Sequence, residues 1–181
     1  MTARPDYTTT RRRARIATAD YVERYVDLLR VLGYCEQCPI YGQAWSCPPF
    51  EFDPLTIWTS YDWLEIDAVQ IEFSTQERAV QRSPLEMQTI VRRAINREKR
   101  MAARRHRHRA RSHCQALVLS AGACELCDPC TRTQGEPCKH PDLMQYSIEA
   151  LGGDVVATVE ELCGFEVKWS EGIQLPQAVL V

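Results

Sequence analysis

The sequence predicts an α+β protein in which a small mixed sheet packs against helices, with cysteine-rich loops between them. Residues 20–32 and 83–109 place apolar side chains at helical spacing behind helix-start signals. Residues 63–74 instead alternate apolar and polar side chains, as in a half-buried strand. Strands and helices do not follow each other in the regular unit of a doubly wound sheet, which favours the α+β class.

Start and stop signals mark the predicted helices of the first half. Asp20 resembles a helix cap, and Gly33 is predicted to end that first helix. An Asp-Pro pair predicts a short helix over residues 53–60. Ser83, followed by proline and then Glu86, is a complete start signal for the long helix that runs to about residue 109.

Shorter elements are predicted in the second half. They are a buried strand at residues 115–121, a helical piece at 147–151, a helix at 154–162 capped by Asp154 and ended by Gly164, and two hairpin strands at 165–169 and 177–181. No internal repeat is visible apart from a doubled cysteine group.

Basic residues concentrate in two stretches. Residues 1–19 hold five arginines against one acid and lack periodicity, which predicts a basic flexible arm before a single domain at 20–181. Residues 97–111 hold eight basic groups against Glu98. Clustered arginine can bind phosphate backbones, but no aromatic residues are interleaved for base stacking. A solvated helix face is favoured, and nucleic acid is a possible partner that is not favoured.

Composition argues against several classes of protein. No apolar run approaches the roughly 20 residues that a membrane span needs, so no membrane association is expected. The N-terminal stretch lacks the apolar core of a secretory signal, and the nine cysteines are an odd number. We therefore expect a cytoplasmic protein, in which clustered cysteines bind metal more often than they form disulfides. No phosphate loop, catalytic triad or carboxylate pair is recognisable, so no enzyme activity is assigned.

The strongest functional signal is the segment CELCDPCTRTQGEPCKH. Cys124, Cys127 and Cys130 are each separated by two residues, and Cys138 follows after a longer gap. Thiolates at this spacing can converge on one inorganic centre. The pattern approaches the ferredoxin run that holds an iron–sulfur cluster, although the last gap is seven residues here.

A second group of cysteines, Cys35, Cys38 and Cys47, lies far upstream. It supplies three thiolates and leaves the fourth position open. Cys114 or Cys163 could complete it, although each is more readily explained as a small buried residue. Alternatively, the last cysteine of the downstream run joins this group, as in two-cluster ferredoxins, or one iron stays open to solvent or substrate.

Iron–sulfur chemistry and zinc compete for these cysteines. The triple spacing favours one or two [4Fe–4S] clusters, because such clusters need a thiolate for each iron. Zinc is the alternative, and it could use Cys124, Cys127, Cys138 and His140 as a tetrahedral set. Aromatic residues near the upstream group are predicted to shield a cluster from water, or simply to pack in the core; they are Tyr41, Trp45 and Phe50.

Three segments carry a resemblance to a known family: CEQCPIYGQAWSCPPF, CELCDPCTRTQGEPCKHP and SIEALGGDVVATVE. From about Tyr21 to its end, the chain resembles the small predicted metal-binding proteins designated domain of unknown function 2284. The resemblance implies a metal or cluster at the seven motif cysteines and little about activity. Cys114 and Cys163 lie outside the family pattern.

These observations together predict an iron–sulfur protein that passes single electrons to a redox partner protein. An enzyme that uses an open-site cluster is one alternative. A structural zinc protein with a basic nucleic-acid-binding surface is the other.

Overall fold

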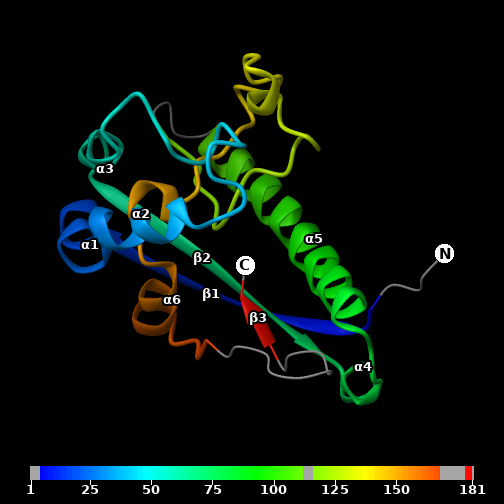
Figure 1. Cartoon of the computed structure of the whole chain (residues 1–181). Helices are drawn as coiled ribbons and strands as arrows, with labels where there is room; N and C mark the ends of the chain where they lie inside the picture. The colour runs from blue at the N-terminus through cyan, green and yellow to red at the C-terminus, as the bar shows by residue number, and fades with distance from the viewer. Residues whose placement is uncertain (1–4, 112–115, 168–177, 181) are drawn as a thin grey trace. The chain divides into compact units, whose positions relative to one another are not determined.

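The structure is a computed structural model that describes residues 5–111, 116–167 and 178–180. The helices and strands follow the order β1 (Tyr7–Ala17), α1 (Thr18–Tyr25), α2 (Leu28–Glu36), α3 (Leu55–Thr59), β2 (Trp63–Phe73), α4 (Thr75–Ala79), α5 (Pro84–Ala110), η1 (Thr131–Gln134), η2 (Glu149–Leu151), α6 (Val155–Cys163) and β3 (Ala178–Leu180) (Figure 1). This mixture of helices and strands confirms the α+β class. In the described part of the chain, no helix combines the length and apolar character that a membrane crossing requires.

Contacts divide the chain into two compact units. Unit 1 consists of Met1–Ala14, Ile66–Arg105 and Val159–Val181, and unit 2 of Arg15–Glu65 and His106–Thr158. The division rests on contacts, whereas independent folding is a separate property. The single domain at residues 20–181 therefore stays a prediction.

Unit 1 is built on a sheet with the strand order β1-β2-β3, in which β2 and β3 are antiparallel. The alternation of β2 buries Ile71 and Phe73, and these pack with Ala94 of α5. The bounds of β2 and α5 match the predicted ranges, 63–74 and 83–109, to within one residue. The start signal of α5 is also confirmed, because the Ser83 hydroxyl accepts the Glu86 N–H (3.3 Å) and the Glu86 carboxylate accepts the Ser83 N–H (2.9 Å).

The N-terminal arginines belong to a strand, β1, where a flexible arm was predicted. The reason lies in Asp67 of β2, whose side chain is only 4% exposed. The Arg11 guanidinium donates to both oxygens of this carboxylate, and Arg13 lies 4.0 Å from it. A buried carboxylate needs a cationic partner, so these polar residues are ordered by pairing with it and not by apolar burial.

Unit 2 has an aromatic core beneath its first helices. Tyr21 of α1 is fully buried, and its ring centroid lies 5.1 Å from that of Trp58 of α3. The Trp58 indole N–H donates to the Leu151 carbonyl (2.8 Å), which ties η2 to this core. The Tyr21 hydroxyl lies 3.0 Å from the Thr158 hydroxyl.

Two helices, α1 and α2, replace the single helix predicted over residues 20–32. Val26 forms a β-bridge with Gly153, and the Asp154 N–H donates to the Tyr25 carbonyl (2.7 Å). Asp27 then caps α2 by accepting the Arg30 N–H (3.0 Å). Long-range pairing thus overrides the helical periodicity, and Gly33 lies inside α2 instead of ending the helix.

The second half differs from prediction mainly at residues 115–121. Their described part, 116–121, is not a strand, and Ser120 makes only an isolated bridge with Ser147. The α6 helix is confirmed, since the Asp154 carboxylate accepts the Ala157 N–H (2.9 Å). The 147–151 piece appears as η2, and β3 lies within the last predicted strand. Residues 165–167 are not a strand, and residues 168–177 lie outside the described ranges.

We expect Gly152→Ala to destabilise unit 2 strongly. Gly152 has a φ of +83°, and a Cβ there would lie 2.6 Å from Leu28 Cδ2 and 3.2 Å from Leu28 Cα. Backbone strain and steric overlap together should lower the free energy of unfolding by about 2–4 kcal/mol. Gly33→Ala is the control, because a Cβ on Gly33 meets nothing within 4 Å.

In a helix interior the Gly33→Ala change should raise that free energy by about 0.5–1 kcal/mol. Urea unfolding of both variants measures the difference. Equal midpoints for the two variants would contradict the packing of α2 against η2.

Candidate metal centre

All seven motif cysteines lie in unit 2. The upstream group begins in the last turn of α2 with Cys35 and continues through the turn that follows it. In that turn the Cys38 N–H donates to the Cys35 carbonyl (3.0 Å). The chain then folds back at Gly42, which has a φ of +69° and donates its N–H to the Pro48 carbonyl (2.8 Å). This closed loop carries Cys47 back toward the first two cysteines.

The three upstream thiols are electrostatic neighbours. The pKa of Cys35 is raised to about 11, mainly by burial and in addition by the negative charges of Glu149, Cys47 and Cys38. Burial likewise raises the pKa of Cys47, and the charges of Cys38 and Glu149 again add to it. A bound cation would offset this burial and repulsion by replacing the thiol protons.

The downstream group occupies the loops around η1. Burial raises the pKa of Cys124, the N–H groups of Leu126 and Gln145 lower it by donating to the sulfur, and the charges of Cys138 and Cys130 raise it. The sulfur of Cys138 also accepts the His140 N–H (3.4 Å).

At Cys124 and at Cys138, one of the donors to the sulfur is the N–H two residues after the cysteine. Hydrogen bonds of this kind stabilise thiolates and orient them. Cys127 is half-buried within the same segment.

One serine joins the two groups. Ser46 is fully buried, and its hydroxyl accepts the Cys124 N–H (2.9 Å). That hydroxyl also lies 3.6 Å from the Cys47 sulfur and lowers the pKa of Cys47 by donating to it. The Ser46 carbonyl accepts the Ser147 N–H (3.1 Å). A single side chain therefore connects the backbone of one cysteine group to a sulfur of the other.

An arginine also holds the two loops together. The Arg132 guanidinium, on η1, donates to the carbonyls of Ala44 (2.8 Å), Cys47 and Pro49. It lies over the Trp45 ring, 5.2 Å from the centroid, and the Trp45 indole N–H donates to the Glu136 carbonyl (3.0 Å). Trp45, one of the aromatic residues flanking the upstream group, thus takes part in joining the loops.

A cavity of about 500 Å³ opens beside Cys138. Its walls are mainly apolar and aromatic, and they consist of Trp45, Gly135, Pro137, Cys138, Pro141, Met144 and Tyr146. Tyr146 also packs edge-on against Phe50, with the centroids 5.5 Å apart. A cysteine of the downstream group therefore lines an apolar recess.

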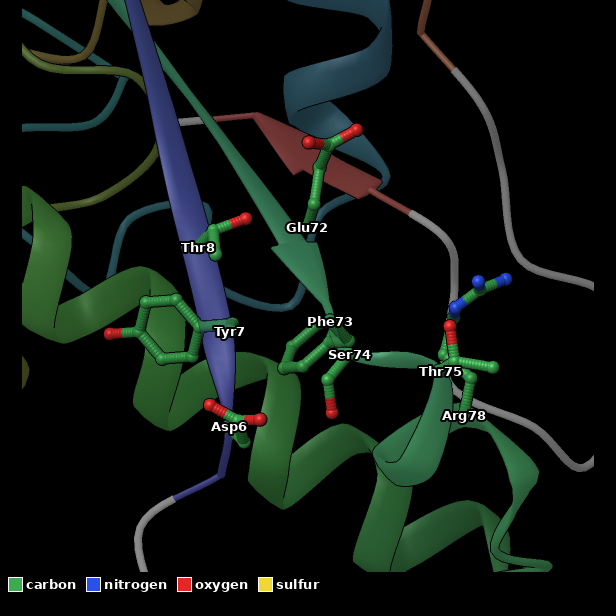
Figure 2. A pocket seen from close by; sticks show the side chains of 8 residues that line it. All are labelled: Asp6, Tyr7, Thr8, Glu72, Phe73, Ser74, Thr75 and Arg78. Atoms are coloured by element: carbon green, nitrogen blue, oxygen red, sulfur yellow. The ribbon is translucent and has the colours of Figure 1, made fainter.

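A second, smaller cavity of about 240 Å³ lies in unit 1. Figure 2 shows its lining side chains at the start of β1 and just before it, at the end of β2, and in and just before α4, with the Asp6 and Glu72 carboxylates on opposite sides. The Tyr7 and Phe73 rings meet edge-to-face there, 6.0 Å apart. No cysteine or histidine lines this cavity, and its polar groups of both signs resemble an ordinary surface hollow.

Other residues considered from the sequence lie elsewhere or contribute differently. Cys163 ends α6 in unit 1, where its side chain is buried and its carbonyl accepts the Arg12 guanidinium (3.0 Å). Cys114 lies outside the described residues. His140 contributes its backbone N–H to Cys138. Among residues 5–111, 116–167 and 178–180, no three His, Cys, Asp or Glu side chains converge tightly enough to hold a single metal ion.

The model of the family described as "Predicted metal-binding protein (DUF2284)" matches residues 23–180. The chain belongs to this family. It is therefore assigned a predicted metal-binding domain that covers both cysteine groups. No curated protein and no solved structure matches the chain.

Three residues that organise the cysteine loops of this DUF2284 chain were not predicted from the sequence. Ser46 and Arg132 connect the two groups, and Glu149 places a negative charge beside the upstream one. The position of Ser46 directly before Cys47 offered a weak signal, as did that of Arg132 inside the gap between Cys130 and Cys138. Glu149 lies in a different segment and could be found only from the fold.

Proposed function

We propose that this DUF2284 protein binds one or two [4Fe–4S] clusters through its seven motif cysteines and transfers single electrons to a redox partner protein. The observation that carries the proposal is the pairing of two groups of cysteines within one unit, joined by Ser46 and Arg132. When bound, such a cluster takes up one electron and releases one. The ligands would be Cys35, Cys38 and Cys47, and Cys124, Cys127, Cys130 and Cys138.

The donors around the downstream sulfurs suit this cofactor. Two N–H groups donate to Cys124, and a third donates to Cys138. In addition, the side-chain amide nitrogen of Gln145 is buried and has no hydrogen-bond partner. An unpaired buried donor costs free energy, and an inorganic sulfide placed beside it would supply the missing acceptor. Hydrogen bonds to sulfur are one of the factors that set the potential of a cluster.

Aromatic side chains pack together beside the cysteine loops. Phe50 stacks on Phe52 with the centroids 4.8 Å apart, and Tyr146 packs edge-on against both rings. Arg132 covers Trp45 on the other loop. Solvent exposure is a further factor in cluster potential, so this aromatic layer would help to tune it.

The cavity beside Cys138 supports a second candidate, an enzyme in which a small molecule binds next to the centre. About 500 Å³ is enough for a compact ligand, and the apolar walls would favour a ligand with aromatic or aliphatic surface. This candidate shares the cofactor with the first, and it differs in adding a bound substrate.

Metal analysis of protein purified without oxygen tests the proposal. We expect a brown protein that contains iron and acid-labile sulfide in similar amounts and that is reduced reversibly in one-electron steps. Colourless protein with stoichiometric zinc would support the structural zinc alternative instead. In that case, nucleic-acid binding that weakens steeply with salt would identify the basic surface as the nucleic-acid-binding site.

A further inference from the structure

A row of arginines runs along one face of α5, in the part of this helix that belongs to unit 1. The arginines follow each other at intervals of four, three and four residues, which place side chains next to each other on a helix surface. At 1.5 Å per residue the row is about 16 Å long. This arginine row consists of Arg93, Arg97, Arg100 and Arg104.

The arginine row lies at the surface of unit 1. A different face of α5 packs against Ile71 and Phe73 of β2; its apolar side chains are Met87, Ile90, Val91, Ala94 and Ile95. Within the row, Arg93, Arg100 and Arg104 are exposed, and the Arg97 side chain is 37% exposed. The helix thus presents its apolar face to the core and a line of guanidinium groups to the outside.

The arginine row lacks the acidic neighbours that are typical of a solvated helix face. Such faces commonly alternate in sign, so that basic and acidic side chains three or four residues apart pair with each other. No Asp or Glu lies three or four residues from any member of the row, and the members are each other's neighbours at these distances. Within the described ranges, no ion pair joins Arg100 or Arg104 to an acidic side chain.

The two acidic residues of α5 are engaged in the fold of unit 1. The Glu86 carboxylate caps the helix through Ser83. Glu98 is buried, accepts the Tyr7 hydroxyl (2.8 Å) and lies 3.7 Å from Arg97. The whole helix carries nine arginine and lysine residues against these two glutamates, a formal charge of +7 in a chain with a net charge of −2. Like charges at these spacings destabilise a helix, and a polyanion bound along the row would offset their repulsion.

The composition of the row favours phosphate groups over an acidic protein surface. Protein interfaces have an apolar centre that excludes water. Between residues 86 and 110 the only exposed large apolar side chain is Met101, at 43%, on the edge of the row. One methionine is too little for such a centre. Arginine, in contrast, is well suited to phosphate oxygens, because its planar group donates two parallel hydrogen bonds.

We propose that the arginine row binds the phosphate backbone of duplex DNA. The major groove of B-DNA is about 12 Å wide and admits an α-helix, whereas the major groove of A-form RNA is deep and narrow. Contacts with phosphates carry no sequence information, so the affinity should not depend on the base sequence. The inference rests on α5 in unit 1 and is independent of the metal that the cysteines hold.

The test is fluorescence anisotropy of a labelled duplex DNA of arbitrary sequence, titrated with the full chain at several salt concentrations. Four phosphate contacts predict a slope of about −3.6 for the logarithm of the association constant against the logarithm of the salt concentration. Between about 50 and about 200 mM salt, the affinity should therefore fall about a hundredfold.

Variants of the row identify the surface that binds. The double variant Arg100→Gln, Arg104→Gln removes two contacts, so its slope should be about −1.8 and its loss of affinity over the same range only about tenfold. The double variant Arg100→Lys, Arg104→Lys keeps both charges and should keep the wild-type slope. Both replacements are good helix formers at exposed positions, and circular dichroism verifies that the helix is intact.

Arg92→Gln is the matched control. Arg92 is an exposed arginine of the same helix, but it lies about a quarter of a turn from Arg93 and has no member of the row three or four residues away. Its replacement should leave the slope close to that of wild type. An equal change of slope in Arg92→Gln and in the double glutamine variant would overturn the assignment to the row.

Three further results would overturn the proposal. Wild type that does not bind the duplex at low salt would leave the row a solvated helix face. Equally tight binding of duplex RNA would contradict the choice of DNA. Displacement of the DNA by polyglutamate at the same concentration of negative charge would assign the row to an acidic polypeptide instead.

Discussion

Cys124→Ala is expected to remove the downstream cluster while the upstream group continues to bind iron. Cys124 is the downstream cysteine with the most hydrogen-bond support, because two N–H groups donate to its sulfur. Without this thiolate one iron lacks a ligand, so the bound iron and sulfide should fall to about half in a chain that carries two clusters. Iron and sulfide analysis of anaerobically reconstituted protein measures the loss.

The control for this variant is Cys163→Ala. Cys163 is buried, but it lies at the end of α6 in unit 1 and outside the family pattern. Its replacement should leave iron and sulfide at the wild-type level per folded chain. An equal loss in both variants would show that the iron content follows stability and not ligation.

Arg132→Ala should have the largest effect on stability among the surface-accessible residues of the cysteine loops. The guanidinium donates to the carbonyls of Ala44, Cys47 and Pro49, so its removal leaves three acceptors without this partner. Hydrogen bonds from charged donors contribute about 1.5–3 kcal/mol each, with partial replacement by water at an exposed site. We expect the free energy of unfolding to fall by about 3 kcal/mol, measured by urea denaturation of the metal-free chain.

Arg132→Lys separates the shape of the guanidinium from its charge. A lysine keeps the positive charge but lacks the planar fork that contacts several carbonyls at once. It should recover less than half of the lost stability. Full recovery by lysine would mean that the charge alone matters and that the loops are not held by directed hydrogen bonds.

The sequence predicted well the elements whose formation depends on local signals. The α5 helix starts at the predicted capping box of Ser83 and Glu86, and β2 follows its predicted alternation. In α5 the deciding contacts join residues that are close in sequence. In β2 a periodic apolar face packs on the core.

Elements that depend on distant partners were predicted wrongly. β1 has no apolar alternation, and its Arg11 and Arg13 pair with the buried Asp67 far along the chain. The break between α1 and α2 arises because Val26 pairs with Gly153. A single sequence does not reveal such pairings, since propensity is a weak guide wherever tertiary contacts compete with it.

The same distinction holds for the candidate site. Cysteine spacing picked out the two groups because ligand spacing is a local pattern. Their link through Ser46, and the position of Glu149 beside the upstream thiols, depend on how separate loops meet. The residues that tune a centre are therefore harder to predict than the residues that bind it.

X-ray absorption at the iron edge of anaerobically reconstituted protein is the most direct test of the central claim, that the motif cysteines gather around iron. We expect a first shell dominated by sulfur and a second shell of neighbouring iron atoms, both diminished in Cys124→Ala. A protein that binds no iron, or iron surrounded by oxygen and nitrogen without an iron neighbour, would contradict the account.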